Sequence, residues 1–386
     1  MDWQAEKSEV MAQARCVVVK VGSAVLTNEK GLNLEVIEDL VKQLAFLHSK
    51  NIRVVLVSSG AVAAGRAVLR SDGKITGIPG KQAASAIGQS RLMHTYDQFF
   101  AKHEVISAQI LLTRDDLGDR QRFLHARNTF TQLLSWGVLP VVNENDTVAV
   151  QELLKFGDND TLGSLLLNLV EADLFINLTT VGGVLDANPQ KTTQSKIMPC
   201  VEDVHSLDLD ELCGGKSSVG TGGMYSKLLA ARRASQLGVP TLILPGCEKG
   251  ILIKAFSGES FNCNGNTTGT WVRANVRGIS RRKFWMAYNQ NIYGSVTVDT
   301  GAAKALRSGG KSLLPAGIVQ VDGNFEPGDL LRVTTEDGDI IGVGLSNYNS
   351  KELTQIMGRK LSDLMASNEP YLEAIHCDNL LIGAVL

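Results

Sequence analysis

The sequence predicts an α/β protein in two parts: a layered α/β/α domain with a mostly parallel central sheet, followed by a small β-barrel domain. For the first part, six short runs rich in valine, isoleucine and leucine are apolar on both faces, and segments with apolar residues at helical spacing lie between them. For the second part, short alternating strands follow residue 280, with closely spaced Asp-Gly and Pro-Gly turns. A length of 386 residues also exceeds what one hydrophobic core usually supports.

The elements of the first domain indicate where a ligand would bind. The predicted strands are 15–22, 52–60, 105–113, 137–143, 172–178 and 239–246. The predicted helices are 34–49, 61–69, 82–102, 122–136, 162–170 and 224–237. Strand–helix–strand units with right-handed crossovers make the sheet mostly parallel. Ligands of such sheets bind at the carboxyl ends of the strands, so the polar residues that follow these strands are the candidates for a site.

A change of composition near residue 257 marks the predicted domain boundary. Residues 257–271, SGESFNCNGNTTGTW, are rich in glycine, asparagine, serine and threonine, which is typical of an exposed connection. We therefore expect four regions along the chain. They are a first domain at 12–258, a linker at 259–279, the β domain at 280–368 and a C-terminal tail at 369–386.

The composition excludes several classes of protein. The 38 lysines and arginines balance 40 acids, so no large field of one sign favours nucleic acid or a membrane as the main partner. The six cysteines lie far apart without a C-x-x-C pair, which is typical of a reducing compartment rather than of a disulfide framework or a zinc site. The first fourteen residues do not resemble a signal peptide, and acids interrupt the longest apolar region, 162–178. We expect a cytoplasmic protein.

Two strand ends carry residues that suit an anion. Lys20 lies in an otherwise apolar strand, and Gly22 and Ser23 follow it, so a cation and exposed N–H groups could hold a phosphate. Taken alone, a lysine that extends its ammonium group to solvent is the commoner explanation. The run SSGAVAAG (58–65) begins a helix, where Ser59 either binds an anion or only caps the helix.

A glycine-rich loop and two acid–amide clusters complete the candidate site. The loop SSVGTGGMYSK (217–227) leads into a helix that carries Lys227, and it is either an anion cradle or a mobile surface loop. The clusters NEND (143–146) and FGDND (156–160) could be metal ligands, solvated turns or a pocket for a small polar molecule. Lysines on two separate glycine-rich turns favour phosphoryl transfer, in which cations surround the charged oxygens and the acid–amide loops form the pocket of the acceptor.

The motifs together resemble a known family. They are VVVKVGSAVLT, VSSGAVAAG, QILLTRDD, VLPVVNENDTV, FGDNDTL and GTGGMYSK. In this order, over residues 15–256, they resemble those of the bacterial glutamate 5-kinases, which have the amino acid kinase fold. The later segment from GSVTVDTGAAKAL to GVGLSNYNS looks like the PUA domain that many bacterial members carry. The resemblance therefore implies an amino acid kinase-like α/β/α domain followed by a PUA-like barrel.

The resemblance implies a reaction: transfer of the ATP γ-phosphoryl group to the side-chain carboxylate of L-glutamate, with Mg²⁺, in the first step of proline biosynthesis. Lys20 and Lys227 would flank the transferred group, and Asp160 would orient them. Glutamate would be bound by Ser59, Asn145, Asp146 and Asn159, with Asp146 on the α-ammonium group and the two asparagines on the carboxylates. ATP would be bound by Lys20, Gly22, Ser23, Thr179, Thr180, Thr221, Gly222, Gly223, Met224, Tyr225, Ser226 and Lys227.

Two chemical points agree with this reaction. A glutamate side chain, with an ordinary pKa of about 4.3, is already ionised at neutral pH, so the nucleophile needs no general base. The remaining difficulty is repulsion between two anions, which cations relieve. We expect no metal cage of protein residues, because Mg²⁺ prefers a few carboxylates together with phosphate oxygens and water.

The resemblance has two departures and several further implications. Ala24 stands where the family commonly has a hydroxyl residue, and Thr180 where it commonly has aspartate; both lie on the nucleotide side of the expected site. Feedback inhibition by proline and assembly as a homodimer or tetramer are implied. An acetylglutamate or aspartate kinase is the nearest alternative among enzymes. RNA binding through RRKFWMAY (281–288) is the alternative of another class, and it is disfavoured because residues 275–386 hold 11 basic and 12 acidic residues.

Overall fold

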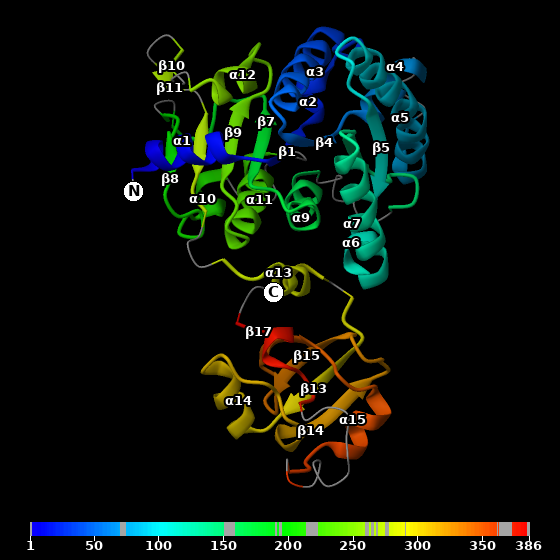
Figure 1. The fold of residues 1–386 in the computed structure, drawn as a ribbon, viewed down its shortest axis with the longest axis vertical. Helices are drawn as coiled ribbons and strands as arrows, with labels where there is room; N and C mark the ends of the chain where they lie inside the picture. The colour runs from blue at the N-terminus through cyan, green and yellow to red at the C-terminus, as the bar shows by residue number, and fades with distance from the viewer. Residues whose placement is uncertain are drawn as a thin grey trace. The chain divides into compact units, whose positions relative to one another are not determined.

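The computed structural model divides into two compact units, Met1–Gly278 and Ile279–Leu386 (Figure 1). It describes residues 2–69, 75–149, 159–189, 191–192, 195–213, 223–258, 262–263, 266–267, 269–274, 278–289, 291–360, 362 and 373–383. Within these ranges no helix is both long enough and apolar enough to cross a bilayer.

The first unit is built on an eight-stranded sheet in the order β5-β6-β4-β1-β7-β9-β12-β8. These strands are β1 (Cys16–Val21), β4 (Arg53–Ser58), β5 (Ser107–Leu112), β6 (Leu139–Glu144), β7 (Leu174–Thr179), β8 (Cys200–Val201), β9 (Thr241–Pro245) and β12 (Thr270–Val272). Every pairing from β5 to β9 is parallel, and only β12 against β9 is antiparallel. All six predicted strands are therefore confirmed, as is the mostly parallel sheet.

Helices cover both faces of this sheet (Figure 1). They are α1 (Trp3–Gln13), α2 (Ser23–Leu26), α3 (Leu34–Ser49), α4 (Ala61–Leu69), α5 (Gly77–Ala101), α6 (Arg114–Gly118), α7 (Arg120–Ser135), α9 (Asn159–Val170), α10 (Leu209–Cys213), α11 (Met224–Gln236) and α12 (Ile251–Phe256). Two short hairpins accompany them: β2 (Thr27–Asn28) with β3 (Gly31–Leu32), and β10 (Asn262–Cys263) with β11 (Asn266–Thr267). The predicted layered α/β/α domain is confirmed.

The alternation of side chains along β1 decides on which face of the sheet the site lies. Val17, Val19 and Val21 pack into one core with α3, α5 and α12. Cys16 and Val18 pack into the other core with α7, α9 and α11. Because successive side chains of a strand point to opposite faces, Lys20 continues the second series and lies on the face that α9 and α11 cover.

The second unit has a five-stranded sheet in the order β14-β13-β15-β16-β17. Its elements are α13 (Arg281–Tyr288), β13 (Gly294–Val298), α14 (Thr300–Arg307), η1 (Pro315–Gly317), β14 (Ile318–Gly323), β15 (Leu330–Thr335), β16 (Ile340–Leu345), α15 (Ser350–Ile356), η2 (Cys377–Asn379) and β17 (Leu380–Ile382). Register shifts in β13 and β15 bend the sheet around a core that includes Val296, Leu331 and Tyr348.

Two segments differ from the expected domain boundaries. The expected linker 259–279 contains β12, in which Trp271 is 1% exposed and pairs with Leu242 of β9. The expected tail 369–386 contains β17, which pairs with β16. In both places three β-branched, aromatic or aliphatic residues form a strand of the sheet, and so short a strand is not evident from composition alone.

Candidate active site

A cavity of about 380 Å³ opens at the carboxyl ends of β1, β4, β6 and β7. This volume is within the range of sites that bind small molecules. The predicted site residues that line it are Lys20, Gly22, Ser23, Ser59, Asp146, Asn159, Thr179, Thr180 and Lys227. Residues that are up to about two hundred positions apart in the sequence thus meet at the edge of the sheet where a ligand was expected.

Lys20 and Lys227 converge on one buried carboxylate, that of Asp160. The Nζ atom of Lys20 lies 2.5 Å from Oδ1 of Asp160, and the Nζ atom of Lys227 lies 3.3 Å from Oδ2. The same carboxylate accepts hydrogen bonds from Ser226 Oγ (2.6 Å, to Oδ2) and Asn177 Nδ2 (2.8 Å, to Oδ1). All three charged side chains are at most 5% exposed, so this ion triad is shielded from water.

The two helices explain how the triad forms. Asp160 is the second residue of α9, where a carboxylate is favoured by the positive end of the helix dipole. Lys227 is the fourth residue of α11, which packs beside α9 on the face of the sheet that also receives Lys20. Burial by itself raises the pKa of Asp160, but the ammonium groups of Lys20 and Lys227 outweigh this effect and lower the pKa to about 2. The carboxylate is therefore ionised at neutral pH and holds both lysines in place.

A second cluster lies where β4, β6 and α9 meet. Asn159 donates from Nδ2 to Ser59 Oγ (2.7 Å) and to Asn143 Oδ1 (2.9 Å). The turn that carries Ser59 depends on Gly60, whose φ of +108° is favoured only by glycine. Asp146 accepts a hydrogen bond of 2.5 Å from Ser85 Oγ at its Oδ2 atom. A carboxylate, amides and a hydroxyl thus line one part of the cavity and offer both acceptors and donors to a polar ligand.

Asn145 does not occupy the place that was expected for it. Its side-chain oxygen accepts a hydrogen bond from Thr147 Oγ1 (2.5 Å), and Asn145 is not among the residues that line the cavity. Asn143 and Glu144 line it instead, and they are the last two residues of β6, which extends one residue further than predicted. The sequence pattern that could have identified Asn143 is its alternation with the core residues Leu139 and Val141 on the same strand.

Comparison with known proteins shows where the chain belongs. Residues 15–245 match the amino acid kinase family, and residues 294–366 match the PUA domain. The chain is 60% identical to the glutamate 5-kinase of Nitratidesulfovibrio vulgaris (strain DP4), with 100% of both chains covered. It is 44% identical to that of Geobacter sulfurreducens, covering 97% of this chain and 100% of the relative. The chain belongs to the glutamate 5-kinase family.

In this glutamate 5-kinase family member, the predicted nucleotide residues lie at the ends of two central strands and at the start of α11. Gly22 and Ser23 follow β1, Thr179 is the last residue of β7, and Thr180 follows it. The other predicted residues open α11: Gly223 is its N-cap, and Met224, Tyr225, Ser226 and Lys227 are its first turn. Thr221 and Gly222 lie outside the described residues. Ala24 and Thr180, the two departures from the family pattern, both line the cavity.

Two cations that the sequence did not single out also line the cavity of this family member. They are Arg66 of α4 and Lys81 of α5. Glu144 is 6% exposed and lines the cavity as well. Arg66 lies one residue beyond the motif SSGAVAAG, and Lys81 lies in α5, which follows α4 in the chain and not a strand of the sheet.

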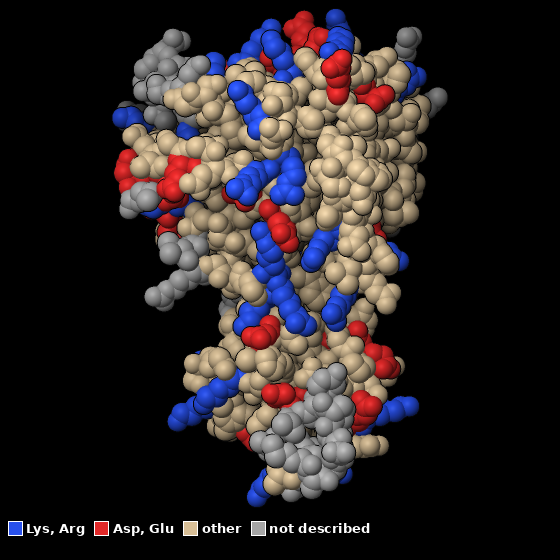
Figure 2. All heavy atoms as spheres, viewed as in Figure 1, with Lys and Arg blue, Asp and Glu red and all other residues tan. Residues whose placement is uncertain are grey.

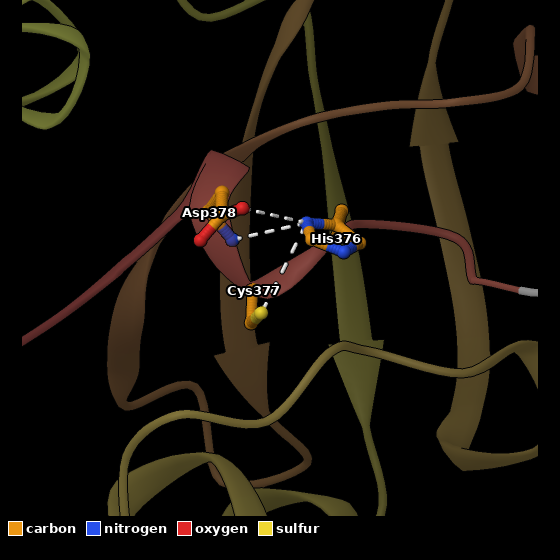
Figure 3. A group of neighbouring side chains, drawn as sticks. All are labelled: His376, Cys377 and Asp378. Carbon is orange, nitrogen blue, oxygen red and sulfur yellow. Dashed lines mark hydrogen bonds and ion pairs between the residues drawn. The ribbon is translucent and has the colours of Figure 1, made fainter.

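A possible metal cluster lies elsewhere, in the PUA-containing unit. Among the described residues, one group of three ligand-type side chains is close enough to share an ion: His376, Cys377 and Asp378 (Figure 3). These residues are consecutive, and Nδ1 of His376 accepts a hydrogen bond from the backbone N–H of Asp378 (3.2 Å). His376 is thus the N-cap of η2, which explains the cluster without an ion.

Proposed function

We propose that the protein transfers the γ-phosphoryl group of ATP to the side-chain carboxylate of L-glutamate, giving L-glutamyl 5-phosphate and ADP. This reaction is the first step of proline biosynthesis. The observation that carries the proposal is the convergence of Lys20 and Lys227 on Asp160 beside the cavity. It occurs in a chain whose relatives over the full length are glutamate 5-kinases.

The ion triad supplies what this reaction needs. The acceptor carboxylate and the ATP phosphates are both anionic, so the main barrier is their mutual repulsion. Lys20 and Lys227 offset this repulsion and stabilise the charge on the transferred group. Asp160 keeps both ammonium groups at fixed positions before the substrates arrive, so that little reorganisation is needed during transfer. Glutamate is already ionised, so no residue has to act as a general base.

The remaining residues divide between the two substrates. Ser59, Asp146 and Asn159 form the proposed glutamate site, with the carboxylate of Asp146 as the counter-charge of the α-ammonium group. Gly22, Ser23, Thr179, Thr180 and residues 221–227 form the proposed ATP site, in which Lys20 and Lys227 face the phosphates.

Mg²⁺ is expected to enter with ATP. Both oxygens of Asp160 already accept hydrogen bonds or ion pairs from protein groups, so this carboxylate is poorly placed to serve as a metal ligand. The ligands would therefore be phosphate oxygens and water; among the described residues, the carboxylates that line the cavity are those of Glu144 and Asp146. When bound, the ion would neutralise phosphate charge beside the two lysines.

A substrate panel tests the proposal. The full-length protein is incubated with ATP, Mg²⁺ and one acceptor, and both ADP release and the acyl phosphate, trapped by hydroxylamine, are measured. We expect turnover with L-glutamate and none with N-acetylglutamate or aspartate. A Lys227→Met variant is the control that ties ADP release to this site. Phosphorylation of N-acetylglutamate but not of glutamate would overturn the proposal in favour of another amino acid kinase.

Three further properties are proposed from the family resemblance: inhibition by proline, assembly as a homodimer or tetramer, and a cytoplasmic location. Adding proline to the glutamate assay tests the first, and light scattering behind size-exclusion chromatography tests the second. RNA binding is not proposed. Both signs of charge are interspersed over the face seen in Figure 2, and residues 275–386 carry slightly more acids than bases. Tight RNA retention in a filter assay at physiological salt would contradict this.

A further inference from the structure

We propose that Ser85 and Gln89 of α5 are positioning residues that aim two oxygen atoms, one of Asp146 and one of Asn159, at the α-ammonium group of the amino acid substrate. This inference rests on the proposed function, because it concerns how the same site selects glutamate with a free amino group. Neither Ser85 nor Gln89 lines the cavity, so both would act through other residues.

Ser85 and Gln89 lie on one face of α5, since residues four apart on a helix are neighbours. Both are buried, at 3% and 8% exposure. Ser85 Oγ donates the 2.5 Å hydrogen bond to Asp146 Oδ2, and Gln89 Oε1 accepts one of 2.8 Å from Asn143 Nδ2. One helix face therefore contacts two residues of the cavity wall that come at or just after the end of β6.

The hydrogen bonds around Asn143 fix the direction of each amide group. Oδ1 of Asn143 accepts from the backbone N–H of Glu144 (2.9 Å), a group that can only donate. The Nδ2 end of Asn143 must therefore face Gln89, which has to present its oxygen. The Asn143 oxygen also accepts from Asn159 Nδ2, and the backbone carbonyl oxygen of Ser58 lies 3.3 Å from the same nitrogen. The Asn143 oxygen and the Ser58 carbonyl oxygen can only accept hydrogen bonds, so the NH₂ end of Asn159 faces these two atoms.

The carbonyl end of Asn159 is then left for the ligand. Its Oδ1 atom is buried and has no hydrogen-bond partner in the protein. Buried polar atoms are rarely left without such a partner. Asn159 lines the cavity, and its Nδ2 contacts occupy the side of the amide that faces β4 and β6. An ammonium group can donate to this oxygen, whereas a carboxylate cannot. We therefore assign Asn159 to the amino group, together with Asp146, and not to the carboxylates as expected from the family motif.

The packing of α5 against α4 explains how α5 can hold these contacts in place. A Cβ atom on Gly88 would lie 1.7 Å from the backbone oxygen of Ala61, and one on Gly65 would lie 1.8 Å from that of Ala84. The two backbones therefore touch directly, with no side chain between them. Gly88 precedes Gln89, and Ala61 begins the helix that follows Ser59. The positioning residues thus lie on a rigid element rather than on a loop.

Three compounds distinguish the assignment of Asn159 to the amino group from its assignment to the carboxylates. All three keep the carboxylate that would be phosphorylated. L-Glutamate also has the amino group and the α-carboxylate, 4-aminobutyrate lacks the α-carboxylate, and glutarate lacks the amino group. We measure KM and kcat for glutamate, KM for ATP, and inhibition constants of both analogues against glutamate. The variants are Ser85→Ala and Gln89→Met. The matched controls are Ser90→Ala and Gln98→Met, whose side chains are exposed on the same helix.

Ser85→Ala and Gln89→Met are each expected to weaken the binding of glutamate and of 4-aminobutyrate roughly tenfold. This is the effect of losing one hydrogen bond that orients a contact with a charged group. Glutarate binding, the KM for ATP and both control variants should stay unchanged. Gln89→Glu should restore glutamate binding, because it keeps an oxygen for Asn143 and replaces only Nε2, which has no partner.

Equal weakening of glutarate, or of glutarate alone, would overturn the assignment to the amino group, as would an unchanged glutamate KM. If Gln89→Met does not fold, Ser85→Ala decides the question, since it removes only one hydroxyl group. A wild-type protein that does not phosphorylate glutamate at all would instead refute the proposed function, and the two failures are therefore distinguishable.

Discussion

Replacing Asp160 by asparagine tests the ion triad most directly, because the change removes one charge and keeps the shape of the side chain. In the wild-type protein the two carboxylate oxygens lie 2.5 Å from Lys20 Nζ and 3.3 Å from Lys227 Nζ. Asn177 donates to Oδ1, and an amide oxygen at that position can still accept this bond. The substitution therefore takes away the charge that the two ammonium groups share, with little loss of packing.

We expect Asp160→Asn to lower the free energy of unfolding by about 3–5 kcal/mol, the usual effect of removing one partner of a buried ion pair. The distances to the carboxylate place the two ammonium nitrogens at most about 8 Å apart. At an effective dielectric constant of about 20, like charges at that separation repel by about 2 kcal/mol. Repulsion between Lys20 and Lys227 thus accounts for much of the loss, and unfavourable burial of their charges for the rest.

ATP should reverse part of this loss, because its phosphates bring negative charge to the same ammonium groups. The measurement is the thermal unfolding midpoint of the full-length protein with and without ATP and Mg²⁺. The midpoint of the variant should fall by about 2–4 °C for each kcal/mol lost. ATP should raise it by more degrees in the variant than in the wild type. ADP release with glutamate should fall about a hundredfold or more, because the lysines are no longer held in position.

Asp339→Asn is the matched control, since Asp339 belongs to an exposed ion pair with Arg307 at 4.0 Å. Exposed pairs contribute little, so this variant should stay within about 0.5 kcal/mol of the wild type. An Asp160→Asn protein that unfolds at the wild-type temperature would refute the reasoning. So would a variant whose midpoint responds to ATP no more than that of the wild type.

Three further predictions follow from the same geometry. Lys227→Met should abolish turnover, while Asp146→Ala should mainly raise the KM for glutamate; steady-state kinetics distinguish the two, and an unchanged KM in the second variant contradicts the role of Asp146. The pKa of Asp160 is lowered to about 2, so its stabilising effect is complete above the ordinary aspartate pKa of about 3.9 and is lost as the pH falls through about 2. Over that interval the free energy of unfolding should fall by about 2 kcal/mol more in the wild type than in Asp160→Asn. Equal losses in the two proteins as the pH is lowered would disprove this. Gly88→Ala should destabilise the protein by about 3 kcal/mol, because its Cβ atom would meet the backbone of α4, and urea unfolding measures the change.

Local periodicity was enough to predict much of the fold. Helices 34–49 and 61–69 were predicted with the boundaries that α3 and α4 have. In α3 the apolar residues recur at helical spacing, and Asn33 caps the first turn through its side chain. Both features lie within a few residues of each other, so they need no knowledge of distant contacts.

The candidate site was predictable only in part, because its contacts join distant segments. Lys20 and Asp160 are 140 positions apart, and nothing in either motif fixes the distance between their side chains. The strand β6 ends at Glu144, one residue later than predicted, and the cavity is lined by Asn143 and not by the expected Asn145. Gln89 gave no sequence pattern at all, since a polar residue in a helix is usually solvated and only the tertiary structure shows that it is buried against Asn143.

The start of α9 links the two halves of the site. Asn159 and Asp160 are its first two residues, and their side chains point to different partners. Asn159 contacts Ser59 and Asn143 on the side of the proposed amino acid site, whereas Asp160 contacts both lysines on the side of the proposed phosphate site. Because one helix turn carries both residues, a movement of α9 would displace the Asn159 amide and the Asp160 carboxylate together. In the proposed reaction, the distance between the acceptor carboxylate and the transferred phosphoryl group would therefore depend on neighbouring residues of a single rigid element.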